Sequence, residues 1–275
     1  MKEKWNLRDK FSIEYVKEEL LRTAYGNGDT FLAKLDPRTL IYWYLFFGIA
    51  PWFIYNKLIL SGLLVFMILT TVMARTSPLI IVILCAGLLG EISFLFFVSL
   101  FFGGGLESLL PMFWLSVKLA VISLASITVF SSIDPERFSD ALLSLGIPVQ
   151  VSFSIAFGYR ILPTLMEEFH QIFLSYRLRG KAPATNGIFY WRSITYFLKI
   201  LVISFYPLLL NGAKRSRTMV EALETKGFSY AASNPKIKKM KISYLAFRVN
   251  DYGFLVASLC YVVAVIWLGS VVTIS

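Results

Sequence analysis

Residues 78–102 read PLIIVILCAGLLGEISFLFFVSLFF, and Glu91 is the one charged side chain among them. A helix needs about 20 mostly apolar residues to cross the hydrocarbon core of a bilayer, and this stretch is long enough. Across the whole chain 57% of residues are hydrophobic, and burying them in a soluble protein would need a larger core than 31 kDa supplies. The stretch therefore predicts a membrane-spanning helix.

Five further apolar stretches flank this one. The six candidates are residues 39–55, 57–74, 78–102, 108–131, 189–210 and 252–274. The stretch 189–210 differs because basic clusters lie at both of its ends. Lys and Arg gather on the cytoplasmic side of membrane proteins, so we expect this stretch to dip into or lie under the bilayer and return. The sequence thus predicts an all-α integral membrane protein with about five transmembrane helices, its N-terminus inside the cell and its C-terminus outside.

Charge is spread unevenly along the chain, whose formal net charge is +10. Residues 135–250 hold 16 Lys and Arg against 6 Asp and Glu, which indicates the cytoplasmic side of a cell-membrane protein. Anionic lipid headgroups account for such charge, and no nucleic-acid-binding motif accompanies it. We expect a cytoplasmic extension at 1–34, four transmembrane helices within 35–131, a cytoplasmic region of amphipathic helices at 132–250 and a last transmembrane helix at 251–275.

The cytoplasmic region is predicted to contain a short helix followed by a long amphipathic one. Asp134 suits the N-cap of the short helix and Pro135 its first position, and the helix should stop at Gly146. The next helix carries one apolar face, which is typical of a surface helix rather than a span. That face comprises Leu162, Leu165, Met166, Phe169, Ile172, Phe173 and Tyr176.

Two helix ends share an arrangement in which a cation directly precedes a glycine. The first consists of Arg177, Arg179 and Gly180, and the second of Glu224, Lys226 and Gly227. Glycine readily takes the left-handed conformation that ends a helix, which would hold the cation at the exposed tip of a rigid helix. A cation near a helix C-terminus also complements the helix dipole, so one such end means little. Two on consecutive helices favour docking onto the carboxylates of a partner.

The order of several short segments resembles that of the CbiQ/EcfT family, the T components of energy-coupling factor (ECF) transporters. The segments are LDPRT at 35–39, ALLSLGIP at 141–148, YRILPTLMEE at 159–168, RLRG at 177–180 and ALETKGF at 222–228. The resemblance covers most of residues 31–230. Each segment alone is weak, whereas their order and spacing together are specific.

The resemblance implies a non-catalytic subunit that passes ATP-driven motion of two ABC ATPase subunits to a membrane-embedded, substrate-binding S component, for uptake of a vitamin or metal ion. In that family two coupling helices each end in an Ala-Arg-Gly motif whose arginine enters a groove of an ATPase. The matching cations here are Arg179 and Lys226, with Leu178 and Thr225 in place of the alanines. Lysine lacks the bidentate fork of arginine, so we expect the two contacts to differ. The chain has no G-x-x-x-x-G-K-[ST] phosphate loop, so ATP hydrolysis must come from the partners.

Other candidate residues carry less weight. Ser116, Ala120 and Ser123 form a stripe of small side chains that permits close helix packing, either within the chain or as a docking face for the S component. His170 is the single histidine and has no Cys or carboxylate cluster at metal-ligand spacing. We expect no metal site and no cofactor.

Two other classes of membrane protein were weighed. A membrane-embedded enzyme, such as a lipid or prenyl transferase or an intramembrane hydrolase, would need a catalytic constellation in or near the spans, and the sequence shows none. A stand-alone secondary transporter would show two similar halves with broken helices, and the long cytoplasmic region argues against it.

Overall fold

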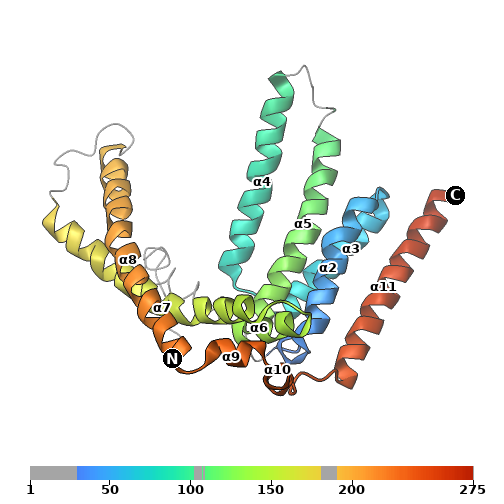
Figure 1. Cartoon of the computed structure of the whole chain (residues 1–275). Coiled ribbons are helices and arrows are strands. Elements are labelled where there is room, and N and C mark those ends of the chain that lie inside the picture. The colour runs from blue at the N-terminus through green and yellow to red at the C-terminus, as the bar shows by residue number, and fades with distance from the viewer. Residues whose placement is uncertain (1–29, 102–106, 108, 181–190, 275) are drawn as a thin grey trace, which may run out of the picture. The chain divides into compact units, whose positions relative to one another are not determined.

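The computed structural model describes residues 30–101, 107, 109–180 and 191–274, and the regular secondary structure of that part of the chain is all helical (Figure 1). The cytoplasmic extension predicted at 1–34 lies outside the described residues except for 30–34. The chain forms two compact units. The first, here called the membrane unit, is built from the chain up to Gly146 and again from Ser243 onward. The second, the hairpin unit, comprises Ile147–Ile242.

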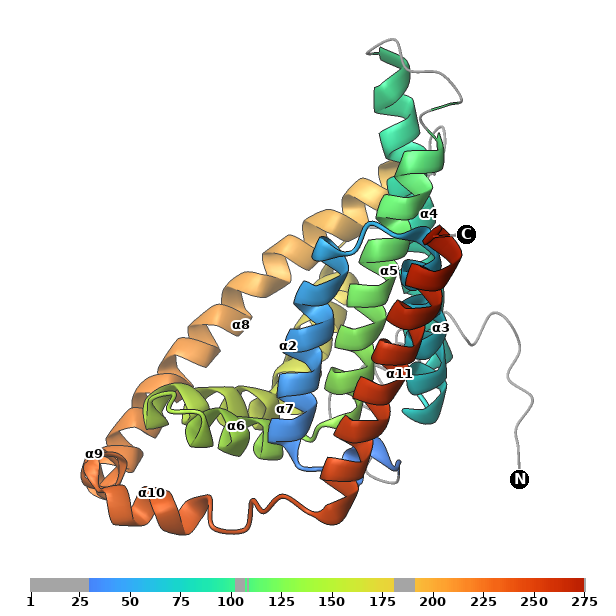
Figure 2. The ribbon, with the colours of Figure 1, turned by 90° about the vertical axis from the view of Figure 1, so that its right-hand side faces the viewer.

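The membrane unit is a bundle centred on one helix. Its elements are η2 (Leu32–Lys34), α2 (Pro37–Phe53), α3 (Lys57–Met73), α4 (Pro78–Phe101), α5 (Leu109–Ser132), α6 (Pro135–Ser144) and α11 (Val249–Ile274). Helix α5 packs against α2, α3 and α4, while α11 lies along α3 and touches α2. Figures 1 and 2 show α2, α3, α5 and α11 running side by side. The segments at the start and at the end of the chain are thereby brought together.

The core of the membrane unit lies between α2, α3 and α5. Trp43 and Phe47 enter it from α2, Leu63 and Met67 from α3, and Val121 from α5, and all five side chains are almost fully buried. The rings of Trp43 and Phe47 lie 4.8 Å apart in a tilted arrangement, which suits the aromatic quadrupoles. This interdigitation fixes the three helices against one another.

Four helices of the described chain are long and apolar enough to cross a membrane: α4, α5, α8 (Trp191–Thr225) and α11 between Val249 and Val271. The prediction of an all-α, multi-pass membrane protein is confirmed. Helices α2 and α3 have 17 residues each, a length of about 25 Å against a hydrocarbon core of about 30 Å. That α2 and α3 cross the bilayer, and that α8 returns without crossing, stay predictions.

Helix ends in the membrane unit follow the local sequence. Asp134 caps α6, as predicted, because its side chain accepts a hydrogen bond of 3.1 Å from the backbone N–H of Glu136. Asp36 caps α2 in the same way through Arg38. Helix α6 ends at Ser144, and Gly146 follows with a positive φ of 98°, so the short helix stops where the sequence predicts.

The hairpin unit is a long antiparallel pair of helices with two short helices after it. Its elements are α7 (Val149–Arg179), α8, α9 (Phe228–Ser233) and α10 (Pro235–Lys241). The predicted apolar face of α7 meets α8: the ring of Phe169 lies 5.3 Å from that of Phe205, and Phe173 lies 5.3 Å from Phe197. Phe173 is buried, and the other residues of that face are half-buried. The 3.6-residue pattern therefore identified the packed side of α7.

Candidate functional site

The first of the two predicted tips is the end of α7. Arg179 is the last residue of the helix, and both Arg177 and Arg179 are exposed. Within the described chain neither guanidinium forms a hydrogen bond or an ion pair with another side chain. Leu178 between them is 86% exposed. An uncovered leucine flanked by two cations forms a small surface with both apolar and charged character.

The glycine after this tip does not have the predicted conformation. Gly180 has φ −81° and ψ 143°, which is extended rather than left-handed backbone. Its N–H still bonds the carbonyl of Tyr176 at 2.9 Å. A Cβ at this position would lie 2.5 Å from the hydroxyl oxygen of Tyr196 on α8. A side chain at this position would therefore have to displace the end of the Tyr196 side chain.

The second tip is the end of α8, and it is built as the sequence predicts. The N–H of Lys226 bonds the carbonyl of Ala222 at 3.2 Å, and that of Gly227 bonds the carbonyl of Glu224 at 2.9 Å. Gly227 has φ 76°, the left-handed conformation that ends the helix and starts α9. Glu224 and Lys226 are both exposed. Phe228 then packs on Phe153 of α7 at 4.8 Å between ring centroids, which holds the turn against the hairpin.

The two tips lie at opposite ends of the helix pair. Since Phe228 packs on Phe153, Lys226 lies near the start of α7, whereas Arg179 is the last residue of that helix. The 26 residues from Phe153 to Arg179 cover about 39 Å at the helical rise. An ion pair between Glu168 and Arg215 joins the helices between the two tips. The pair thus holds two cations far apart on one stiff support.

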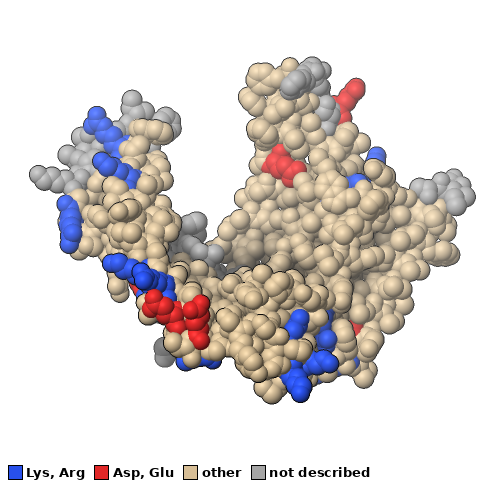
Figure 3. Space-filling model, in the orientation of Figure 1, with Lys and Arg blue, Asp and Glu red and all other residues tan. Residues whose placement is uncertain are grey.

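Charged side chains are concentrated on the hairpin unit, whereas the face of the membrane unit around α4 is almost free of them (Figure 3). No residue of α4 is buried, and its helix is the most apolar of the candidate spans. The distribution separates a surface suited to lipid from one suited to charged partners.

The small-residue stripe on α5 is mostly covered by the chain itself. Ser116 and Ala120 are buried, and Ser123 is half-buried. Burial favours packing within the bundle for the first two. A role for this stripe in docking the S component stays a prediction.

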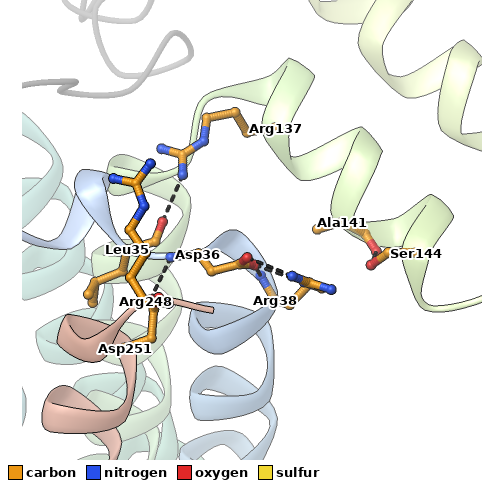
Figure 4. A network of polar contacts seen from close by, with 8 residues as sticks. All are labelled: Leu35, Asp36, Arg38, Arg137, Ala141, Ser144, Arg248 and Asp251. Carbon is orange, nitrogen blue, oxygen red and sulfur yellow. Dashed lines mark hydrogen bonds and ion pairs between the residues drawn. The ribbon is translucent and has the colours of Figure 1, made fainter. Parts of the chain in front are cut away.

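A polar junction joins the starts of α2 and α11, and sequence reasoning did not find it (Figure 4). The buried carboxylate of Asp251 accepts hydrogen bonds from the backbone N–H groups of Asp36 at 2.7 Å and of Arg248 at 2.6 Å. Arg137 of α6 donates to the carbonyl of Leu35 at 2.8 Å and to that of Ala33. An aspartate at the start of an apolar run was the available signal, but its partner lies 215 residues away.

The junction also favours the ionised form of one carboxylate, that of Asp36. Arg38 donates to both oxygens of Asp36, through Nε at 3.0 Å and Nη2 at 2.8 Å. Burial alone would raise the pKa of Asp36, but the hydrogen bonds from Arg38 and the charges of Arg38 and Arg137 outweigh it and hold that pKa below its ordinary value. The guanidinium of Arg38 also lies 4.4 Å from the ring centre of Phe247, so the residues leading into α11 are fixed to the start of α2.

Comparison with known proteins finds one family and three relatives, and all of them are transport proteins. The family described as "CbiQ: Cobalt transport protein" matches residues 28–237. The energy-coupling factor transporter transmembrane protein EcfT of Staphylococcus aureus is 24% identical over 250 residues, covering 82% of this chain and 90% of that protein. The protein of the same name from Brevibacillus brevis is 24% identical over 264 residues, with 88% and 96% covered. That of Limosilactobacillus fermentum is 26% identical over 142 residues, about half of each chain.

Proposed function

The chain belongs to the CbiQ family of cobalt transport proteins and is the non-catalytic transmembrane T component of an ECF transporter, and from this we propose that Arg179 and Lys226 are its contacts with two partner ABC ATPase subunits. The observation that carries the proposal is the placing of these two exposed cations at opposite ends of one helix pair. A separation of about 39 Å suits two acceptor sites, one on each ATPase. Both cations and the membrane-facing ends of the partners would then lie on the cytoplasmic side of the plasma membrane.

The paired helices suit the transmission of motion. Helices α7 and α8 are continuous over 31 and 35 residues, and aromatic contacts and the Glu168–Arg215 ion pair hold them together. A displacement of an ATPase at either tip would therefore move the whole pair. The first half of α8 carries exposed apolar side chains, among them Leu198 and Val202, and we assign this surface to the S component that receives the motion and delivers the vitamin or metal ion.

The first test is co-purification of the ATPases and the S component with the Arg179→Ala variant. A charge-assisted hydrogen bond contributes about 1.5–3 kcal/mol, so we expect ATPase recovery to fall roughly tenfold or more and uptake to be lost, while membrane insertion is unchanged. The matched control is Arg217→Ala, because Arg217 is an exposed arginine of the same helix pair whose partner is the surface residue Glu221. Unchanged recovery and uptake with Arg179→Ala would refute the assignment.

The second test addresses sidedness. Single cysteines replace Leu178, Lys226 or Tyr55 in a background in which the two native cysteines, Cys85 and Cys260, are serine. Tyr55 lies at the exposed α2–α3 turn, which the predicted topology places outside. A membrane-impermeant maleimide added to intact cells should label only the cysteine at 55. Labelling of either tip from outside would contradict the proposed topology.

A further inference from the structure

Two hollows lie one above the other between α2 and α11 and the segments that lead into them. The first, about 330 Å³, is lined by Lys34, Asp36, Arg137, Tyr244 and Arg248 among others. The second, about 500 Å³, is lined by side chains of α2 and α11 that are almost all apolar. Both volumes fall within the range of about 300–1,000 Å³ that ligand sites occupy.

The first hollow has an excess of positive charge. Its one carboxylate, Asp36, is already engaged by Arg38, and the hydroxyl of Tyr244 donates to Asp140 at 2.7 Å. Within the described chain the side chains of Lys34 and Arg248 form no hydrogen bond or ion pair. Arg137 uses two of its five N–H donors on backbone carbonyls. An anion is the partner that this hollow lacks.

The second hollow is a groove with a buried floor and exposed rims. Trp43, Phe47 and Val262 form the floor and are at most 9% exposed. Side chains that are about half exposed or more form the rims: Tyr42 and Phe46 on α2, and Leu259 and Val263 on α11. The hydroxyl of Ser258 on the lining accepts a hydrogen bond from Trp43 Nε1 at 3.2 Å. The groove therefore offers a ligand mainly apolar contacts, and no charged side chain of the described residues lines it.

The two hollows follow the same helices. From Asp36 to Tyr42 is six residues and from Arg248 to Leu255 is seven, so the nearest lining residues of the two hollows are about 10 Å apart along the helices. The groove lies between two helices that are expected to span the bilayer, and its rims are exposed apolar side chains. An acyl chain of the surrounding lipid is the occupant that fits this chemistry.

We propose that α2 and α11 hold one anionic phospholipid, with its phosphate among Lys34, Arg137 and Arg248 and an acyl chain in the groove between Tyr42 and Leu259. Cations attract anionic headgroups at the surface of the leaflet, and the adjacent apolar groove accepts the tail. The lipid would add a second connection between the first and last helices of the membrane unit, beside the Asp251 hydrogen bonds.

The test is native mass spectrometry of the full chain in detergent with equal amounts of phosphatidylglycerol and phosphatidylcholine. The unaltered protein should retain phosphatidylglycerol preferentially. In the double variant Lys34→Gln/Arg248→Gln the ratio of the two retained lipids should fall about 25-fold, because each of the two cations near an anionic headgroup contributes about fivefold. The matched control, Lys236→Gln/Lys239→Gln on α10, removes the same charge from an exposed surface elsewhere and should leave the ratio unchanged.

A third variant separates tail from headgroup. Leu259→Trp fills the groove and should lower the retention of both lipids, and gel filtration with a thermal melt shows that each variant is folded. An equal ratio in the double variant and its control would overturn the headgroup assignment. Undiminished retention in Leu259→Trp would overturn the tail assignment. Stabilisation of the protein by inorganic phosphate equal to that by phosphatidylglycerol would identify a free-anion site instead, and a protein retained in place of lipid would also refute the proposal.

Discussion

The two helix tips carry the same short sequence pattern and end in different ways. At the end of α7 the chain continues through Gly180 in an extended conformation, and the hydroxyl of Tyr196 on α8 occupies the space that a side chain at Gly180 would need. At the end of α8 the turn is local, and Gly227 is needed for its positive φ. The position of the first cation thus depends on a neighbouring helix, whereas the second depends on its own backbone. A cation followed by glycine marks a helix end without specifying how the end is built.

The contrast between the two helix ends is tested most directly by placing the same residue, asparagine, at Gly180 and at Gly227. Asparagine tolerates the left-handed conformation better than other non-glycine residues, so Gly227→Asn should keep uptake within about twofold of the unaltered protein. Gly180→Asn places a side chain where Tyr196 already lies. We expect a loss of uptake of about fivefold, since displacing the end of Tyr196 costs on the order of 1 kcal/mol.

A second substitution shows whether Tyr196 is the cause. Its hydroxyl is buried and has no hydrogen-bond partner in the described part of the chain, so Tyr196→Phe alone should cost little. Combined with Gly180→Ala it should restore most of the uptake that Gly180→Ala loses, as measured in the same transport assay. Equal loss in the single and the double variant would show that the glycine serves another purpose.

A smaller effect is expected from loosening the helix pair between the tips. Glu168→Gln removes the charge that pairs with Arg215, and we expect a loss of about 1 kcal/mol in the free energy of unfolding and a partial loss of uptake. The control Glu221→Gln breaks an exposed i,i+4 pair with Arg217, which contributes under about 0.5 kcal/mol. Thermal melts and uptake should rank the two variants in this order.

The smallest change is expected from Lys226→Arg. It supplies the fork-shaped donor that the resemblance to the family predicts at this tip and leaves the backbone of the turn unaltered. ATPase recovery should rise by about twofold or less, as measured by co-purification. A fall in recovery would mean that the acceptor on the second ATPase is shaped for lysine.

Much of the architecture could be predicted from local sequence. Apolar runs located the long helices, Asp134 and Gly146 bounded α6, and the spacing of Phe169 and Phe173 identified the packed face of α7. These features depend on residues within a few turns of one another. Their physical causes are helix capping and amphipathicity, and both can be recognised from one short stretch of sequence.

What the sequence could not provide depends on residues far apart. The extended conformation of Gly180 follows from where Tyr196 lies after the chain has reversed direction. The hydrogen bond from the N–H of Asp36 to Asp251 follows from the meeting of α2 and α11. In one sequence alone, an aspartate before an apolar run does not reveal which backbone groups it will satisfy.

The carboxylate of Asp251 also sets an order for biosynthesis. The backbone N–H of Asp36, at the very start of α2, has its acceptor 215 residues further along the chain. While the ribosome is still making the intervening helices, that donor must be satisfied by water or by the translocation machinery. Helix α2 can therefore pack on α3 and α5 early, but the N–H of Asp36 reaches this acceptor only when α11 has been made, so the junction at the start of α2 is completed at the end of synthesis.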